Sequence, residues 1–362
     1  MKQQVLLCPG PVVVSSRVRR ATIEPDICHR EKEFSVLLSK VRSKLLRVFK
    51  IARTHKAVVV SGSGTAALET AVLSSVRPRK KLLVIDNGVY GQRILKIAKI
   101  HGIKTVHLRS PILEALKVSR IERALKKNPQ IDVVAMVHHE TSTGLLNPAD
   151  QVGRLARKNG KIFLLDAISS LGADGLSFKH VDICVGSAGK CLHGYPGLSF
   201  VLVGNRARSR LSQMRPKSLY LDLRSLLQSQ EKGESPFTPA VQLIRAFDVA
   251  LDQLLKVGLS SRIRAYQRNA RFITSGLERL GIRCLLPESL RSSALSALRL
   301  PRRMKYATLH AALKKKGFVI YAGQSKLSGK IFRISAMGSV TPQQLKKLLR
   351  VMSVISKKQG WV

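Results

Sequence analysis

The sequence predicts an α/β fold, in which a large domain with a mainly parallel sheet flanked by helices precedes a smaller C-terminal α+β domain. Three observations lead to this prediction. The chain has 362 residues, a length that suits one large domain with a smaller companion. Short β-branched runs alternate with longer amphipathic stretches in the first two thirds of the chain. From about Asp248 onward, this alternation gives way to a mixed pattern of helices and strands.

Strands of the large domain are expected where short runs are apolar on both faces, because helices cover both sides of a parallel sheet. The sequence has such runs at 57–60, 81–85, 133–137, 162–165, 183–186 and 199–203. Helices are expected between them, such as 66–75 after the first strand and 151–159, which ends at an Asn-Gly pair. This order of elements is the βαβ pattern of an α/β fold.

The C-terminal third predicts a second, smaller body. We expect, in order, a long helical stretch from Asp248 through Leu280, a strand at 294–300, a helix from Thr308, a strand at 317–321 and a final helix after Pro342. The long helix, around 249–277, links the two bodies in this prediction. The predicted domains are therefore residues 1–250 and 251–362, with the N-terminal segment, about 1–15, packing against the smaller one.

The chain is strongly basic, since 64 Lys and Arg residues against 21 Asp and Glu residues give a net charge of +43. Such a charge attracts nucleic acid or anionic membranes non-specifically. The basic residues are spread along the chain, however, and the aromatic side chains that stack on bases make up only 5% of it. We therefore expect a solvated basic surface, with no specific nucleic-acid partner and no membrane partner.

Compartment and redox state are predicted from what the sequence lacks. Residues 1–11 do not show the charged start, apolar run and small-residue cleavage site of a secretory signal, and the sequence has no run of eighteen apolar residues. The five cysteines are odd in number and lack the paired spacing of a zinc site or a disulfide framework. We expect a cytoplasmic protein with reduced thiols and no metal site.

Residues 61–67 are a candidate phosphate-binding turn. They read Ser-Gly-Ser-Gly-Thr-Ala-Ala, follow a predicted strand and open a predicted helix. Backbone N–H groups at a helix N-terminus bind phosphate, and hydroxyl groups add further donors. The run lacks the lysine of a nucleotide P-loop and the third glycine of a dinucleotide fingerprint. On its own, an ordinary strand-to-helix turn explains the run equally well.

Asp166 and Lys190 each follow a predicted strand, at the end where parallel α/β sheets bind ligands. A carboxylate at Asp166 can keep a heteroaromatic nitrogen protonated, or it can cap a helix. Lys190 lies among small residues, in Ser-Ala-Gly-Lys-Cys, where crowding lowers the pKa of a lysine and favours Schiff-base chemistry. A surface lysine is the alternative. The order of phosphate turn, aspartate and lysine favours the catalytic interpretation of all three.

These residues and further motifs give the chain a specific resemblance. Over nearly its whole length it resembles the fold-type I, class V aminotransferases, which depend on pyridoxal phosphate (PLP). Within that family it is most similar to 2-aminoethylphosphonate:pyruvate transaminases, and then to alanine:glyoxylate and serine:pyruvate aminotransferases. The matching stretches are residues 7–11, 61–67, 87–93, 136–144, 166–172, 187–191, 195–197 and 332–334, while 218–223 and 317–321 favour the aminoethylphosphonate branch.

The resemblance implies a set of cofactor-binding residues. Ser63, Gly64 and Thr65 correspond to the residues that bind the cofactor phosphate in the family. Tyr90 corresponds to the side chain that stacks on the cofactor ring, and Thr141 to one that bonds near its phenolic oxygen. The cofactor that this resemblance implies is PLP.

The catalytic residues implied by the resemblance are Asp166 and Lys190. Asp166 stabilises the pyridinium that makes the ring an electron sink. Lys190 holds the cofactor as a Schiff base, is displaced by the amino donor and then moves the proton at the reacting carbon. Thr238 reaches the phosphate of a neighbouring subunit, which implies a homodimer. Arg333 binds the substrate carboxylate, for which a guanidinium fork is well suited.

Two positions depart from the family pattern. Gly189 precedes the lysine where relatives often carry a polar side chain, and Ser235 stands where some relatives have a phosphate-binding tyrosine. The expected reaction is transfer of the amino group of 2-aminoethylphosphonate to pyruvate, giving phosphonoacetaldehyde and alanine. The alternatives are alanine:glyoxylate or serine:pyruvate transamination and, from another class, a degenerate transaminase scaffold that binds nucleic acid through its basic surface.

Overall fold

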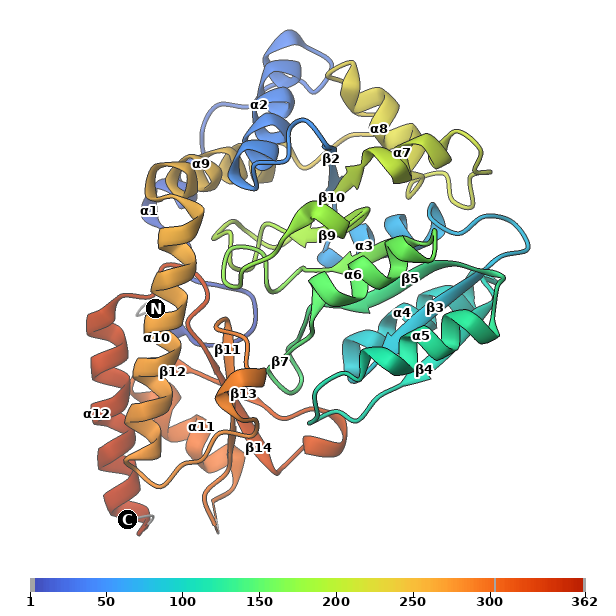
Figure 1. Ribbon diagram of the computed structural model, residues 1–362. Coiled ribbons are helices and arrows are strands. Elements are labelled where there is room, and N and C mark those ends of the chain that lie inside the picture. Colours follow the sequence, from blue (N-terminus) through green and yellow to red (C-terminus); the bar gives the residue numbers. More distant parts are fainter. Residues whose placement is uncertain (1–3, 303, 361–362) are drawn as a thin grey trace.

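The computed structural model describes residues 4–302 and 304–360, and its largest feature is a seven-stranded sheet (Figure 1). The strand order is β2-β10-β9-β8-β5-β3-β4, and only β10 runs antiparallel to its neighbours. The strands are β2 (His55–Ser61), β3 (Lys81–Asp86), β4 (Thr105–Arg109), β5 (Ile131–Val137), β8 (Ile162–Asp166), β9 (Ile183–Ser187) and β10 (Leu198–Gly204). The predicted α/β class, with a mainly parallel sheet, is confirmed.

Six of the seven strands lie where the sequence predicts them, and β4 is the one that the prediction missed. Its sequence, Thr-Val-His-Leu-Arg, alternates between exposed and half-buried residues, because β4 lies at the edge of the sheet. The apolar pattern used for the prediction finds strands that are buried on both faces. An edge strand with polar residues does not show that pattern.

Helices cover both faces of the sheet, as alternate strand residues show. Val59, Leu83 and Val134 belong to one apolar core, whereas Val58, Leu82 and Val133 belong to another on the opposite face. In Figure 1, α6 lies in front of the sheet and α3 behind it. One face is covered by α2 (Lys32–Val48), α5 (Val118–Lys127), α6 (Ala149–Lys158) and α9 (Val241–Val257), with the short α1 (Ser16–Arg20) beside them, and the other by α3 (Gly64–Leu73), α4 (Val89–Ile100), α7 (Asn205–Leu211) and α8 (Leu223–Glu231).

A second sheet forms the centre of the C-terminal part. It is antiparallel and has the order β11-β14-β13, formed by Leu295–Arg299, Ile331–Ser335 and Tyr321–Ala322. Its apolar core includes residues of α10 (Leu259–Glu278), α11 (Tyr306–Lys315) and α12 (Pro342–Gln359). Near the N-terminus, β1 (Val5–Leu6) pairs in parallel with β12 (Phe318–Val319). The division of the chain at residue 250 remains a proposal.

Two predicted elements are corrected by the structure. The single long helix is two helices, since α9 ends at Val257 and α10 begins at Leu259. Gly258 between them has φ +83°, a left-handed conformation that stops a helix and that glycine adopts without strain. The predicted strand at 317–321 is also divided, because β12 pairs with β1 whereas β13 joins β14 in a different sheet.

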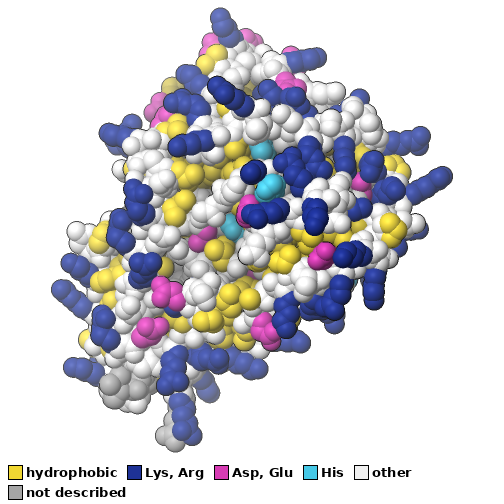
Figure 2. All heavy atoms as spheres, in the orientation of Figure 1, with side chains coloured by type: hydrophobic (Ala, Val, Ile, Leu, Met, Phe, Trp, Pro, Cys, Tyr) yellow, Lys and Arg dark blue, Asp and Glu magenta, His cyan; other side chains and the backbone are white. Residues whose placement is uncertain are grey.

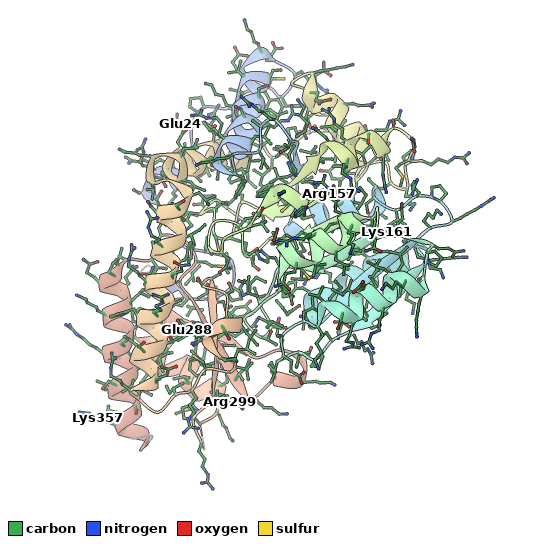
Figure 3. The ribbon with its side chains drawn as sticks, in the orientation of Figure 1. Glu24, Arg157, Lys161, Glu288, Arg299 and Lys357 are labelled. Carbon is green, nitrogen blue, oxygen red and sulfur yellow. The ribbon has the colours of Figure 1, made fainter. Side chains whose placement is uncertain are left out.

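The basic residues are distributed over the surface. Figure 2 shows Lys and Arg side chains over the whole visible face, with few acidic side chains between them. In Figure 3, Arg157 on α6 and Lys357 on α12 lie far apart in the view. Within the described residues, the structure contains no helix with the length and apolar character needed to cross a membrane.

Candidate active site

A cavity of about 290 Å³ lies beyond the carboxyl ends of β5, β8 and β9 and next to the N-terminus of α3. This is the position at which α/β sheets bind ligands. Seven of the nine predicted site residues line the cavity: Ser63, Gly64, Thr65, Tyr90, Thr141, Asp166 and Lys190. The structure therefore brings together residues that are up to 127 positions apart in the sequence, because the strands and turns that carry them end at one edge of the sheet.

The turn after β2 leaves a helix N-terminus facing the cavity. Ser63 is the N-cap of α3, and its side chain makes no capping hydrogen bond within the described chain. Gly64 packs closely against Ile168, since a Cβ at Gly64 would lie 2.8 Å from the Cδ1 atom of that isoleucine. The first N–H groups of α3 and the hydroxyl groups of Ser63 and Thr65 can therefore receive an anionic oxygen at this end of the cavity.

Arg93 is a cavity residue that the sequence analysis did not single out. Its Nη1 donates to Thr65 Oγ1 at 3.0 Å, and its guanidinium lies over the ring of Tyr90, 4.6 Å from the centroid. The sequence could have indicated Arg93 as a site residue, because it lies three residues after Tyr90 and therefore on the same face of the helix. Arg93 thus adds a positive charge to the end of the cavity formed by the N-terminus of α3.

Asp166 is the last residue of β8 and is 3% exposed. Its Oδ1 accepts a hydrogen bond from the backbone N–H of Ile168 at 3.0 Å. Burial raises the pKa of this carboxyl to about 6, while that hydrogen bond and the cations Arg93 and Lys190 lower the pKa in part. A buried carboxylate with so few donors is well suited to pair with a cationic ring nitrogen in the same cavity.

Lys190 follows β9 and is held against the N-terminal segment. Its Nζ donates a short hydrogen bond to the backbone oxygen of Pro9, and burial lowers the pKa of the amine from its ordinary value. Gly10 leaves room for this arrangement, because a Cβ there would lie 2.3 Å from Lys190 Nζ. Pro9 and Gly10 thereby place the amine beside the cavity, partly desolvated.

Gly189, the first departure from the family pattern, has a steric explanation. A Cβ at Gly189 would lie 2.7 Å from the backbone nitrogen of Pro196, so a larger residue is excluded unless the backbone around Pro196 shifts. Ser235, the second departure, is buried, and its hydroxyl donates to the backbone oxygen of Phe237 at 2.6 Å. Both substitutions are therefore accommodated by local packing.

The backbone groups of Tyr90 and Thr141 are each held by a charged side chain, Glu140 for Tyr90 and Arg333 for Thr141. The backbone N–H of Tyr90, in the first turn of α4, donates to Glu140 Oε2 at 3.0 Å. The backbone oxygen of Thr141 accepts from Arg333 Nη1 at 2.9 Å. Thr141 Oγ1 is buried and has no hydrogen-bond partner among the residues described, which leaves it available to a ligand.

Arg333 and Thr238 do not line the cavity. Arg333, on β14, is 1% exposed, and its Nε donates to the backbone oxygen of Ala322 at 2.9 Å. Its Nη2 is buried and has no partner in the described part of the chain, so one arm of the guanidinium is available near Thr141. Thr238 is exposed and lies beside Phe237 and Tyr220 in a separate hollow.

Comparison with known proteins decides the family. The model of the family Aminotransferase class-V matches residues 16–349. The chain belongs to the class-V aminotransferases. The 2-aminoethylphosphonate–pyruvate transaminase of Vibrio cholerae is 36% identical to it over 356 residues, which cover 96% of both chains. That of Syntrophobacter fumaroxidans is 34% identical over 355 residues, covering 96% of this chain and 94% of the relative.

A solved structure supports the same assignment. The alanine–glyoxylate aminotransferase of Nostoc superposes with a TM-score of 0.92 at 25% identity, covering 97% of this chain and 94% of the other. The protein is therefore a PLP-dependent enzyme of fold type I that moves an amino group from a donor to a 2-oxo acid acceptor. The PLP dependence predicted from the sequence is confirmed.

The cavity of this class-V aminotransferase fits PLP at each polar group of the cofactor. The N-terminus of α3 suits the phosphate, and the carboxyl of Asp166 suits the pyridine nitrogen. The unpartnered hydroxyl of Thr141 suits the phenolic oxygen, and Lys190 Nζ lies in the same cavity for the carbonyl carbon. The individual roles of these residues remain proposals.

Proposed function

We propose that this class-V aminotransferase transfers the amino group of 2-aminoethylphosphonate to pyruvate, giving phosphonoacetaldehyde and alanine. The observation that carries the proposal is the 36% and 34% identity, over 96% of this chain, to two relatives that bear the name of this activity. The likeness to the Nostoc alanine–glyoxylate aminotransferase, at 25% identity, favours alanine:glyoxylate transamination as the second candidate.

In this proposal the chain's own residues bind and orient PLP, which withdraws electrons from the bond that breaks at the substrate carbon. Ser63, Gly64 and Thr65 hold the phosphate. Tyr90 covers the ring, and its position is set by the contact of its backbone N–H with Glu140. Asp166 keeps a proton on the ring nitrogen, since a buried carboxylate is stabilised by a positive partner.

Lys190 has two roles in the proposed reaction. Its amine binds the cofactor covalently, which requires the uncharged form, and burial favours that form by lowering the pKa. Once displaced by the amino donor, the amine moves a proton at the amino-bearing carbon of the substrate. The backbone oxygen of Pro9 is an acceptor that can orient the amine in this second role.

Arg333 is proposed to bind the carboxylate of pyruvate or alanine through its unpartnered Nη2. The other two nitrogens are already held by the backbone oxygens of Ala322 and Thr141, so the guanidinium is fixed before substrate arrives. A fixed planar donor binds a carboxylate with a smaller loss of conformational entropy than a mobile lysine does.

A homodimer is part of the proposal. Thr238 lies in a surface region that includes Leu219, which is 84% exposed, and Tyr220, whose ring packs 5.1 Å from that of Phe237. This region is joined to the phosphate-binding turn, since the backbone N–H of Ala240 donates to Ser61 Oγ at 3.0 Å. In the proposed dimer a second subunit covers Leu219, and Thr238 reaches the phosphate site of that subunit. The cytoplasmic location stays a prediction.

The substrate is tested by comparing three amino donors with purified holoenzyme. We expect kcat/KM for 2-aminoethylphosphonate with pyruvate to exceed that for alanine with glyoxylate, and for serine with pyruvate, by at least about tenfold, which is roughly 1.4 kcal/mol in transition-state binding. A higher kcat/KM for alanine or serine would reject the phosphonate substrate and leave the family assignment in place.

A further inference from the structure

His139 is a cavity residue whose chemistry the proposed function does not use. It lies on β6 (His139–Glu140), a two-residue strand that pairs with β7 (Leu145–Leu146). Thr141 follows directly, as the first residue of the turn between the two strands. His139 and Thr141 line the cavity, whereas Glu140 contacts the first turn of α4.

Both side chains on the cavity side have a polar atom in need of a partner. His139 is 1% exposed and Thr141 is 3% exposed. His139 Nε2 and Thr141 Oγ1 are buried, and neither atom has a hydrogen-bond partner within the described structure. Buried polar atoms of this kind are nearly always paired in a working protein, so a ligand that fills the cavity is expected to contact both.

Ser169 lies beside the other ring nitrogen of His139 and also lines the cavity. Its Oγ lies 3.1 Å from His139 Nδ1 and 3.1 Å from the His139 backbone oxygen, while the Ser169 backbone oxygen lies 3.5 Å from Nδ1. If the hydroxyl donates to Nδ1, which is the shorter of the two Nδ1 contacts, the imidazole carries its own proton on Nε2, whereas donation from Nδ1 to the backbone oxygen would leave Nε2 an acceptor. Burial lowers the pKa of His139 to about 3, so the ring is neutral at neutral pH. Nε2–H is then an uncharged donor that faces the same cavity as the Thr141 hydroxyl.

We propose that His139 is a further cofactor-binding residue, which donates from Nε2 to the phenolic oxygen of PLP beside the Thr141 hydroxyl. Two neutral donors in the same cavity suit an anionic oxygen, whereas the ring nitrogen is matched by the Asp166 carboxyl. A donor at this oxygen stabilises its anionic form. When the cofactor is bound, this oxygen shares a proton with the Lys190 nitrogen. The donor therefore lowers the pKa of that shared proton.

His138, which precedes His139 in the sequence, provides a matched control. It is also buried, at 3% exposed, and its Nδ1 lies 2.9 Å from the hydroxyl of Ser170. Burial lowers the pKa of His138 to about 4, so it is neutral as well. His138 is not among the residues that line the cavity. Replacing either histidine by phenylalanine removes a buried imidazole, but only one of the two replacements removes the proposed donor.

The first test measures the bound cofactor spectroscopically, without substrate. In His139→Phe we expect the midpoint of the pH titration of the cofactor's visible absorption to move to higher pH, with about tenfold weaker PLP binding. His138→Phe should leave both unchanged. Ser169→Ala should move the midpoint in the same direction, by less. Equal titration midpoints and affinities in His139→Phe and His138→Phe would overturn the proposal.

A second measurement does not depend on a folded variant. In wild-type protein labelled with ¹⁵N at histidine, adding PLP should shift the His139 Nε2 resonance and show its directly bonded proton. Identical His139 resonances in cofactor-free and cofactor-loaded protein would also reject the proposal. Neither measurement involves an amino donor, so each result is independent of whether 2-aminoethylphosphonate is the substrate.

Discussion

At the scale of single residues, burial sets the chemistry of the site. The Asp166 carboxyl and the Lys190 amine have opposite ordinary charges, and burial disfavours the charged form of both. The cavity without cofactor therefore holds two groups that are poorly solvated and incompletely paired. In the proposed roles, the cofactor's protonated ring nitrogen and carbonyl carbon would give each of them a partner, which would link cofactor binding to the stability of the protein.

Asp166→Asn tests this link through pH. The pKa of Asp166 is raised by burial to about 6, above the value of about 3.9 expected in the unfolded chain, so ionisation destabilises the cofactor-free protein as pH rises from about 4 through 6. Cofactor-free Asp166→Asn should be more stable than wild type at pH 7, by on the order of 3 kcal/mol, and the gain should vanish near pH 4. Denaturant unfolding at a series of pH values measures it.

The same variant should lose most of its turnover, because an amide cannot hold the ring proton. Asp174 is the control: burial also raises its pKa to about 6, but it lies outside the cavity and accepts from Ser292 and Ser293. Asp174→Asn should keep turnover. An Asp166→Asn protein that is no more stable than wild type at pH 7 would contradict the argument.

At the scale of elements, the two-residue strand β6 carries side chains that contact two different parts of the site. β6 presents His139 to the cavity and Glu140 to the N-terminus of α4, where Glu140 Oε2 accepts from the backbone N–H of Tyr90. A carboxylate at this end of a helix is stabilised by the helix dipole. The helix that carries Tyr90 is thus held by a residue adjacent in sequence to Thr141, so the positions of Tyr90 and Thr141 are coupled through Glu140.

Gly88→Ala tests this arrangement. A Cβ at Gly88 would lie 2.3 Å from Glu140 Cδ, and Glu140 is fully buried and is also held by Ser142 Oγ at 2.5 Å, so it cannot move aside freely. We expect a loss of about 1–3 kcal/mol in the free energy of unfolding, together with weaker PLP binding, because α4 and Tyr90 must shift. Chemical denaturation and a cofactor titration measure the two effects.

Gly175→Ala is the matched control, since a Cβ at Gly175 meets no described atom within 4 Å. It should change the free energy of unfolding by less than about 0.5 kcal/mol and leave cofactor binding unchanged. If Gly88→Ala behaved like Gly175→Ala, Glu140 would not be fixed in the way that its contacts indicate.

At the scale of the whole molecule, the chain has a net charge of +43, with Lys and Arg side chains across the face that Figure 2 shows, and its 2-oxo acid acceptor is an anion. A positive field of this kind raises the local concentration of anions and their rate of association, and salt screens it. We expect kcat/KM for the 2-oxo acid acceptor to fall as ionic strength rises from about 0.01 M to 0.15 M, with kcat nearly constant. Steady-state kinetics in a series of sodium chloride concentrations measures it.

An uncharged osmolyte such as sucrose, added at matched osmolarity, is the control for general solvent effects. A kcat/KM that does not change with salt would mean that the surface charge has no part in substrate capture.

The sequence by itself determined the fold class, six strands of the large sheet and the presence of a PLP-dependent transaminase. The strands could be predicted because apolar runs bounded by turn residues are local features, and the transaminase because motifs along nearly the whole chain resemble those of the class V family. The prediction missed β4, whose residues are polar at the edge of the sheet, and it joined α9 to α10 across Gly258, whose φ of +83° is a backbone property that residue type alone does not fix.

Only the tertiary structure decided which side chains share the cavity and which atoms in it lack partners. Arg93 and His139 lie within matching stretches of the sequence but were given no role there, and they enter the site because α4 and β6 pack at the carboxyl edge of the sheet. The structure also keeps Arg333 and Thr238 off the cavity wall, since contact depends on how distant segments are brought together. Burial, and with it the pKa of Asp166, arises from that packing rather than from any neighbour in the sequence.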